Sequence, residues 1–278
     1  MSDFSFYLVT DPHYFDESFG RSGSAYEARS RTDQKCVAET PAILDAGFAQ
    51  IAADRETRVI LIPGDLVYRG EYQSHVGFRK RLYRLQEAGK KIYLITARHD
   101  YAENPCEFIG DRTVPVAGME RSDLRDFYRE FGFDDAIAEH RESMSYVAQL
   151  APGLRLLALN CDGDCKDFKG LWPEQLDWAV AQIQAAHAAG ERIIAMTHYP
   201  LLPFSAVMGL IGDAHAGSRR AGADLYRPYA RPGGDRAHLA GRQHHYRCAD
   251  GMLCGLPLRL SQGDGGTGWP GGHSLLHD

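Results

Sequence analysis

The sequence predicts an α/β fold in which mostly parallel or mixed β-sheets are sandwiched by helices. Short apolar runs of strand length alternate with longer amphipathic segments, and near-continuous apolar runs are typical of parallel strands that are covered on both faces. The chain has 278 residues, 44% of them hydrophobic, so it can bury a substantial core. Strands that alternate with helices also predict right-handed crossover connections.

The predicted elements follow one another up to about residue 200. Five apolar runs predict strands, at residues 4–10, 59–62, 92–96, 154–160 and 192–197. Helical periodicity marks three segments between them, through Ile43, Leu44, Phe48 and Ile51, through Phe78, Leu82 and Leu85, and through the run 173–186 with Pro173 at its start. No linker divides this part, so we expect residues 1–217 to form one domain, with residues 218–278 as its C-terminal part.

Composition and charge exclude several classes of partner. The formal net charge of -6 and the pI near 6.1 provide no basic surface for extended nucleic acid. No apolar run approaches the roughly 20 residues that span a bilayer, and no basic segment or cleavage site precedes the first predicted strand. We therefore expect a cytoplasmic protein without a membrane partner.

The cysteines favour free thiols over a disulfide framework. Six of them are scattered along the chain, at Cys36, Cys106, Cys161, Cys165, Cys248 and Cys254. A zinc site made from the last four is the alternative, although no pair has the tight spacing of a zinc knuckle.

Two polar segments follow strand ends, where α/β proteins place ligand loops. Residues 14–35 contain side chains that can bind a phosphate or stack on a base, namely Tyr14, Arg21, Tyr26, Arg29 and Arg31. An ordinary solvated loop is the alternative. Residues 161–170 predict a solvated turn, because they lack the glycine and the distal glutamate of an EF-hand loop. Contact with an active site is the alternative, because the segment follows a predicted strand.

Acidic and imidazole side chains follow the ends of four predicted strands. They are Asp11 and His13, Asp65, His99 with Asp100, and His198. The carboxyl ends of parallel strands lie along one edge of a sheet, so we expect these groups to converge. Carboxylate and imidazole together suit Zn²⁺, Mn²⁺ or Fe²⁺. Asp11 and His13 are two residues apart, which in extended geometry points both side chains the same way. Caps or surface residues are the alternative for any one of them.

These residues carry a resemblance to a known family. The segments DPH (11–13), PGDLVYRGE (63–71), ARHD (97–100), MTHYP (196–200) and GRQHH (241–245) resemble the successive motifs D-x-H, G-D, G-N-H-D/E, H and G-H-x-H of the calcineurin-like metallophosphoesterase superfamily. The segment 170–183 resembles the helix between the third and fourth motifs. The resemblance implies an α/β/β/α sandwich and a metal-dependent phosphoester hydrolase with one or two divalent ions, Mn, Fe or Zn.

The resemblance also implies a role for each matching residue. Asp11, His13 and Asp65 would bind one metal, with Asp65 shared with a second metal that His198 and His244 would bind. His99 would stabilise or protonate the reacting phosphate, and Asp100 would orient His99.

Two arginines depart from the family pattern. Arg98 replaces an asparagine ligand and Arg242 replaces a histidine ligand, and a guanidinium has no acceptor to offer a cation. We expect a weakened second metal site, in which Arg98 supplies positive charge toward substrate. The alternative is that His215, His238 or His245 completes the site.

The C-terminal part lacks hydrophobic periodicity from about residue 218, and it is rich in Gly, Pro and Arg. Residues 233–239, translated one nucleotide along, are compatible with Gly-Val-Thr-Ala-Leu-Ile, so we hypothesise a frameshifted or degenerate C-terminus. The motifs together predict a phosphoesterase that hydrolyses a small phosphomonoester or phosphodiester with a metal-activated hydroxide. The alternative is a catalytically impaired protein of the same fold that binds phosphates or nucleotides. The sequence does not predict an oligomeric state.

Overall fold

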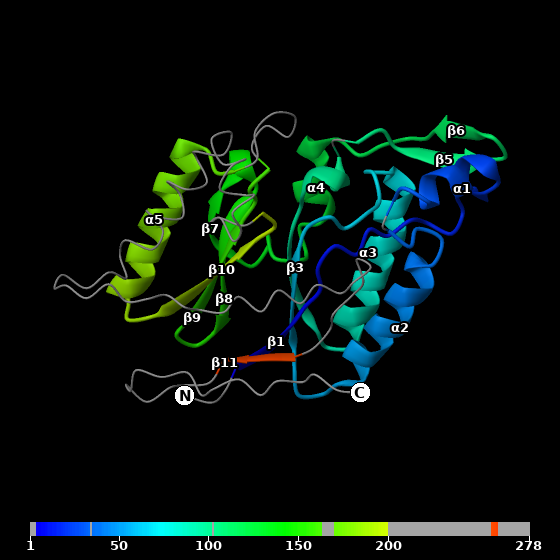
Figure 1. Ribbon diagram of the computed structural model, residues 1–278. Coiled ribbons are helices and arrows are strands. Elements are labelled where there is room, and N and C mark those ends of the chain that lie inside the picture. The colour runs from blue at the N-terminus through cyan, green and yellow to red at the C-terminus, as the bar shows by residue number, and fades with distance from the viewer. Residues whose placement is uncertain (1–3, 34, 102, 163–169, 200–256, 261–278) are drawn as a thin grey trace, which may run out of the picture.

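The computed structural model describes residues 4–33, 35–101, 103–162, 170–199 and 257–260 (Figure 1). These residues form two four-stranded sheets and a smaller three-stranded sheet. In the described part of the chain, no helix is long and apolar enough to cross a membrane.

The first sheet has the strand order β11-β1-β3-β4. Its parallel strands are β1 (Phe4–Leu8), β3 (Val59–Pro63) and β4 (Lys91–Ile95), and β11 (Pro257–Leu260) pairs antiparallel with β1. Helices α2 (Thr40–Ala53) and α3 (Tyr72–Glu87) connect the parallel strands. All five residues of β3 are buried, as expected for a central strand covered on both faces.

The second sheet has the order β10-β9-β8-β7. Its strands are β7 (Ala136–His140), β8 (Ser145–Ala151), β9 (Leu154–Leu159) and β10 (Arg192–Thr197), and only the pair β9 and β10 is parallel. Helix α5 (Pro173–Ala188) packs on β9 and β10. One hydrophobic core joins the two sheets, for example through Ile62 and Leu94 with Tyr146 and Leu156. The Tyr146 hydroxyl donates to the Leu94 carbonyl across this interface, at 2.9 Å.

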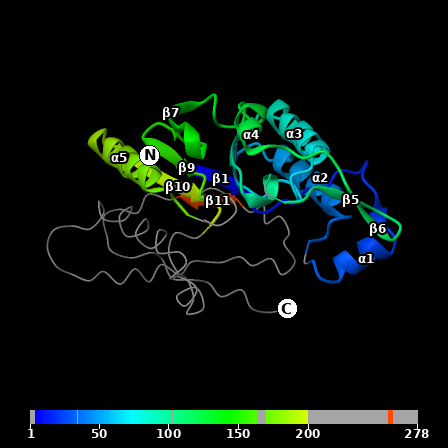
Figure 2. The same cartoon turned by 90° about the horizontal axis from the view of Figure 1, so that it is seen from above.

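The layers form the predicted sandwich. Figures 1 and 2 show α5 on one side of the paired sheets and α2 and α3 on the other. The α/β class with mixed sheets between helices is therefore confirmed, and the structure contains a strand at each of the five predicted ranges. The hydrophobic pattern of the sequence predicted no helix or strand between residues 101 and 153, where the structure has β7, β8 and α4 (Arg121–Phe127).

The third sheet lies beside α2 and α3 (Figure 1). It contains β2 (Arg21–Ser22), β5 (Cys106–Ile109) and β6 (Arg112–Pro115), and α1 (Ser24–Ser30) packs against it. Part of the predicted ligand loop 14–35 is thus ordered by a separate small core around Phe15, Tyr68 and Phe108. Two single turns of 3-10 helix, Arg98–Asp100 and Arg141–Ser143, complete the described elements.

Several sequence interpretations involve residues outside the described ranges. Among the described cysteines, Cys36, Cys106 and Cys161 are free thiols, while Cys165, Cys248 and Cys254 lie outside. Apart from β11, residues 218–278 are also outside the description, so the domain boundary and the frameshift hypothesis stay predictions.

Candidate metal centre

The polar residues at the strand ends converge, as predicted. Asp11 and His13 follow β1, Asp65 follows β3, the turn with His99 follows β4, and His198 follows β10 of the second sheet. The two sheets meet here, because His198 Nδ1 lies 2.9 Å from the carbonyl oxygen of Pro63, the last residue of β3. The site is therefore formed where the parallel strands of both sheets end.

Asp65 is the centre of this cluster. Its Oδ2 lies 3.4 Å from Nε2 of His198, 3.6 Å from Nε2 of His13 and 3.9 Å from Nε2 of His99. Its Oδ1 accepts the backbone N–H of His99 at 3.2 Å. Burial opposes the charge of this carboxylate, but His198, His13 and His99 outweigh burial and hold the pKa of Asp65 below its ordinary value.

The tautomer of His198 is set by the backbone. The Nδ1–H group donates to the Pro63 carbonyl, which leaves a lone pair on Nε2 in the neutral ring. That lone pair faces the Asp65 carboxylate at 3.4 Å. Two acceptors at this distance repel each other unless a proton or a cation lies between them. A backbone carbonyl that orients an imidazole in this way is typical of metal-binding histidines.

Asp11 brings a second carboxylate to the same place. One ligand atom each from Asp11, Asp65 and His198 lies within 4.8 Å of the others. Burial raises the pKa of Asp11, and the negative charge of Asp65 raises it further, while His198 lowers it. A divalent cation would offset the repulsion between the two carboxylates, and two carboxylates with an imidazole suit Mn²⁺, Fe²⁺ or Zn²⁺. The donor set therefore fits the predicted metal.

The imidazole of His13 is held in its neutral form. Burial lowers its pKa to about 3, although Asp65 favours the charged form. Its Nε2 lies 3.9 Å from Oδ1 of Asp11. Metal ligation requires the neutral imidazole, so burial prepares His13 for that role.

Left-handed backbone conformations aim three of these side chains. Asp11, His13 and Asp65 have φ values of 49°, 42° and 54°, and among the described residues Met144 is the only other non-glycine residue with positive φ. Such conformations are uncommon outside glycine and concentrate at functional sites. The expected reason for the convergence of Asp11 and His13, extended alternation along a strand, is therefore wrong. Both lie beyond β1 in a loop, which is held by the hydrogen bond from the His13 N–H to the Asp65 carbonyl at 3.0 Å.

His99 lies at the edge of the cluster. Its ring meets the ring of His13 edge-on, with 5.0 Å between the centroids. Burial lowers the pKa of His99, and Lys35 adds to this effect, while Asp65 opposes it. This place beside the candidate ligands is compatible with a role toward the phosphate, which stays a prediction.

Asp100 supports the backbone around the site. Its Oδ1 accepts the N–H groups of Leu66 and Val67 at 2.7 and 3.1 Å, and its Oδ2 accepts the N–H of Ala97 at 2.8 Å. These bonds join the turn after β3 to the turn after β4. Asp100 thus fixes the loops that carry Asp65 and His99, whereas the sequence interpretation gave it the imidazole as its partner.

The predicted arginines contact residues other than the candidate ligands. Arg98 Nε is 3.4 Å from Oε1 of Glu103, and 40% of the Arg98 side chain is exposed. Arg29 Nε donates to the Tyr68 hydroxyl at 2.9 Å, and Arg21 lies in β2 of the small sheet. His244, the alternatives His215, His238 and His245, and Arg242 lie outside the described residues.

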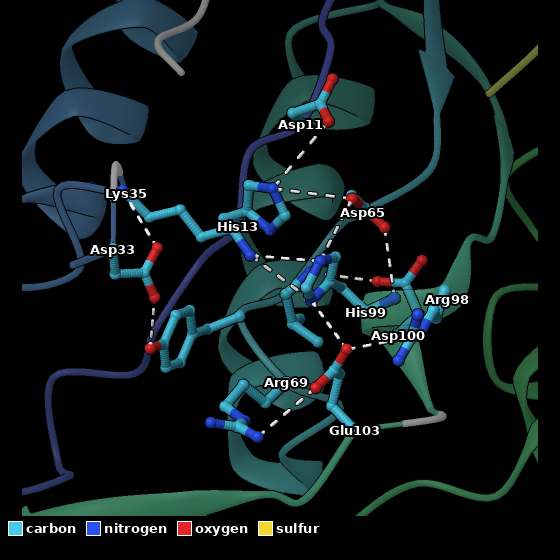
Figure 3. A network of polar contacts seen from close by, with 12 residues as sticks. Asp11, His13, Asp33, Lys35, Asp65, Arg69, Arg98, His99, Asp100 and Glu103 are labelled. Atoms are coloured by element: carbon cyan, nitrogen blue, oxygen red, sulfur yellow. Dashed lines mark hydrogen bonds and ion pairs between the residues drawn. The ribbon is translucent and has the colours of Figure 1, made fainter. Parts of the chain in front are cut away.

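Sequence reasoning missed three polar groups near the centre. Lys35 reaches the ring of His99, and Glu103 pairs with both Arg98 and Arg69 (Figure 3). Asp162 is buried, which raises its pKa to about 6, and its Oδ2 accepts the Tyr101 hydroxyl at 2.7 Å. The prediction of a solvated turn is therefore wrong for Cys161 and Asp162. Their burial favours the alternative, which rested on their position directly after β9.

Comparison with known proteins supports the fold. No protein-family model and no curated protein sequence matches the chain. The structure is similar to the crystal structure of a dimetal phosphatase from Danio rerio, with a TM-score of 0.51 and 14% sequence identity, over 80% of this chain and 76% of that chain. The chain thus has a metallophosphatase fold, as the resemblance to the metallophosphoesterase superfamily implied.

Proposed function

We propose that the protein is a metal-dependent phosphoesterase that hydrolyses a small phosphomonoester or phosphodiester. The observation that carries the proposal is the meeting of Asp11, Asp65 and His198 within 4.8 Å, at the edge where both sheets end. The fold adds support, because the similar solved structure is that of a dimetal phosphatase.

Each residue has a distinct part in this proposal. Asp11, His13, Asp65 and His198 would hold the metal, which when bound supplies positive charge to phosphoryl oxygens and acidifies a water nucleophile. Asp65 also fixes the backbone of His99 through the bond to its N–H. His99, beside the ligands, would donate a proton or a hydrogen bond to the phosphate oxygens or the leaving group.

A weakened second metal site is part of the proposal. Arg98 has no acceptor where the family pattern has a ligand. Its contact with Glu103 supports a position of the guanidinium at the margin of the site. A protein that binds phosphate without hydrolysis is the rival function that this departure favours.

The test is metal analysis of the purified protein together with hydrolysis of an aryl phosphate monoester and diester with added Mn²⁺. The proposal expects bound metal and turnover that a chelator removes and Mn²⁺ restores. Bound phosphate without turnover would favour the rival. Turnover that persists after complete metal removal would contradict the metal mechanism.

A further inference from the structure

Lys35 brings a positive charge to the candidate metal centre from the loop before α2. Its Nζ lies 3.2 Å from Nε2 and 3.4 Å from Nδ1 of His99. A neutral imidazole has one lone pair, whereas an ammonium has three N–H donors. His99 therefore engages at most one of them, and the other two can donate to a ligand.

A set of contacts holds the lysine in this direction. Asp33 Oδ1 accepts the backbone N–H of Lys35 at 3.3 Å, and Asp33 Oδ2 accepts the Tyr68 hydroxyl at 2.7 Å. The ammonium lies 5.4 Å from the centroid of the Tyr68 ring, a cation–π distance. Figure 3 shows the side chain reaching from this anchor toward His13 and His99. The direction of the side chain is thus built into the loop.

The neighbouring carboxylates are shared with other cations. Asp33 lies 3.3 Å from Arg29 Nε, and Glu103 lies 3.4 Å from both Arg98 and Arg69. Burial lowers the pKa of Lys35, while Asp33, Asp65 and Glu103 favour its charged form. If a cation binds to Asp65, it neutralises the charge of that carboxylate as well. An anionic ligand would then be the natural partner of the ammonium.

We propose that Lys35 binds the non-bridging oxygens of the substrate phosphate and makes the site selective for phosphomonoesters over phosphodiesters. The inference rests on the proposed function. A phosphomonoester carries nearly two negative charges at neutral pH, because its second pKa is about 6, and a diester carries one. The second organic group of a diester also occupies an oxygen that a monoester presents as an acceptor. Lys35 should therefore bind a monoester more strongly than a diester.

The experiment compares Lys35→Met, Lys35→Arg and the control Lys91→Met. Lys91 is an exposed lysine at the start of β4, at the opposite end of that strand from His99. In the presence of Mn²⁺, Lys35→Met should lower kcat/KM for an aryl monoester by about tenfold to a hundredfold, the range of a charge-assisted hydrogen bond. The fall for an aryl diester should be several-fold smaller. Lys35→Arg should retain part of the preference, and Lys91→Met should match the wild type.

A binding measurement separates this inference from the proposed function. Titration of the Mn²⁺-loaded protein should show that Lys35→Met weakens inorganic phosphate by a similar factor and dimethyl phosphate much less, with unchanged metal content. If the wild type hydrolyses neither ester, the proposed function fails, and these titrations still decide the role of Lys35. Equal losses for both ester classes would make Lys35 a positioning residue for His99 and overturn the selectivity. Three further results would overturn the selectivity. Lys35→Met could bind inorganic phosphate as tightly as the wild type does, or it could have a changed metal content. The wild-type protein could also prefer the diester.

Discussion

His75 and His198 are both enclosed by the protein, yet their rings meet opposite surroundings. In α3, His75 has Nδ1 at 2.7 Å from the Tyr128 hydroxyl and Nε2 at 2.8 Å from the Asp100 carbonyl. One nitrogen accepts and the other donates, and burial lowers its pKa to about 4, so the neutral ring is satisfied. His198 donates through Nδ1 but turns its Nε2 lone pair toward a carboxylate. A structural histidine is thus complete within the protein, whereas the candidate ligand is complete only with a proton or a cation between its Nε2 and the carboxylate.

The largest effect is expected for Asp65, the centre of the candidate metal cluster. Asp65→Ala should abolish hydrolysis with only a modest loss of fold, because Asp65 faces three imidazoles and borders the candidate ligands. Turnover of an aryl phosphate and circular dichroism measure the two properties. Asp134→Ala is the control, since that carboxylate belongs to an exposed pair with Arg129. An Asp65→Ala protein with wild-type turnover would remove the metal mechanism from consideration.

His99 should affect the chemistry and leave the metal in place. His99→Ala should lower kcat by roughly 10²–10⁴-fold, the range of a positioned acid–base group, with unchanged metal content. Steady-state kinetics and elemental analysis measure these quantities on the same preparation. If metal is lost instead, His99 is a ligand, and the role assigned to it is wrong.

The smallest effect concerns the second metal. The purified protein should hold about one tightly bound metal per chain rather than the pair of two-metal sites. Arg98→Asn restores an acceptor and removes a charge, so it should raise second-metal occupancy at saturating Mn²⁺. Arg112→Asn, in the small sheet, is the control. Two full equivalents in the wild type would mean that other ligands already complete the second site.

The sequence predicted the strand ends because the parallel strands are continuous apolar runs that polar residues follow at once. It missed β7, where a register shift between Ala136 and Ala138 interrupts the pairing, and β8, in which buried and exposed residues do not alternate. It predicted that Asp65 and His198 lie close together, but the reason, one shared sheet, is wrong, because they follow strands of two different sheets that meet at Pro63 and His198. The left-handed conformations of Asp11, His13 and Asp65 could not be predicted from the sequence. They depend on hydrogen bonds between distant residues, such as the one from the His13 N–H to the Asp65 carbonyl.

The contact partners of individual side chains could not be predicted from the sequence either. Lys35 was part of a polar loop, and nothing in the order of residues placed it beside His99, which lies 64 positions away. Asp100 was given the neighbouring imidazole as its partner, but the backbone amides of Leu66, Val67 and Ala97 take its carboxylate. The partner of each side chain depends on how the loops pack against one another, and local sequence patterns do not predict that packing.

The comparison between the two histidines can be tested most directly by thermal unfolding with and without Mn²⁺. His75→Leu should lower the free energy of unfolding by about 1–3 kcal/mol, since it leaves two buried polar groups unpaired, while Mn²⁺ still raises Tm as in the wild type. His198→Leu should lower the free energy of unfolding of the metal-free protein by a smaller amount, because one acceptor, the Pro63 carbonyl, loses its donor, and Mn²⁺ should no longer raise Tm to the same extent. A wild-type protein that Mn²⁺ does not stabilise, or a His198→Leu protein that responds as fully as the wild type, would contradict a metal centre built on His198 and Asp65.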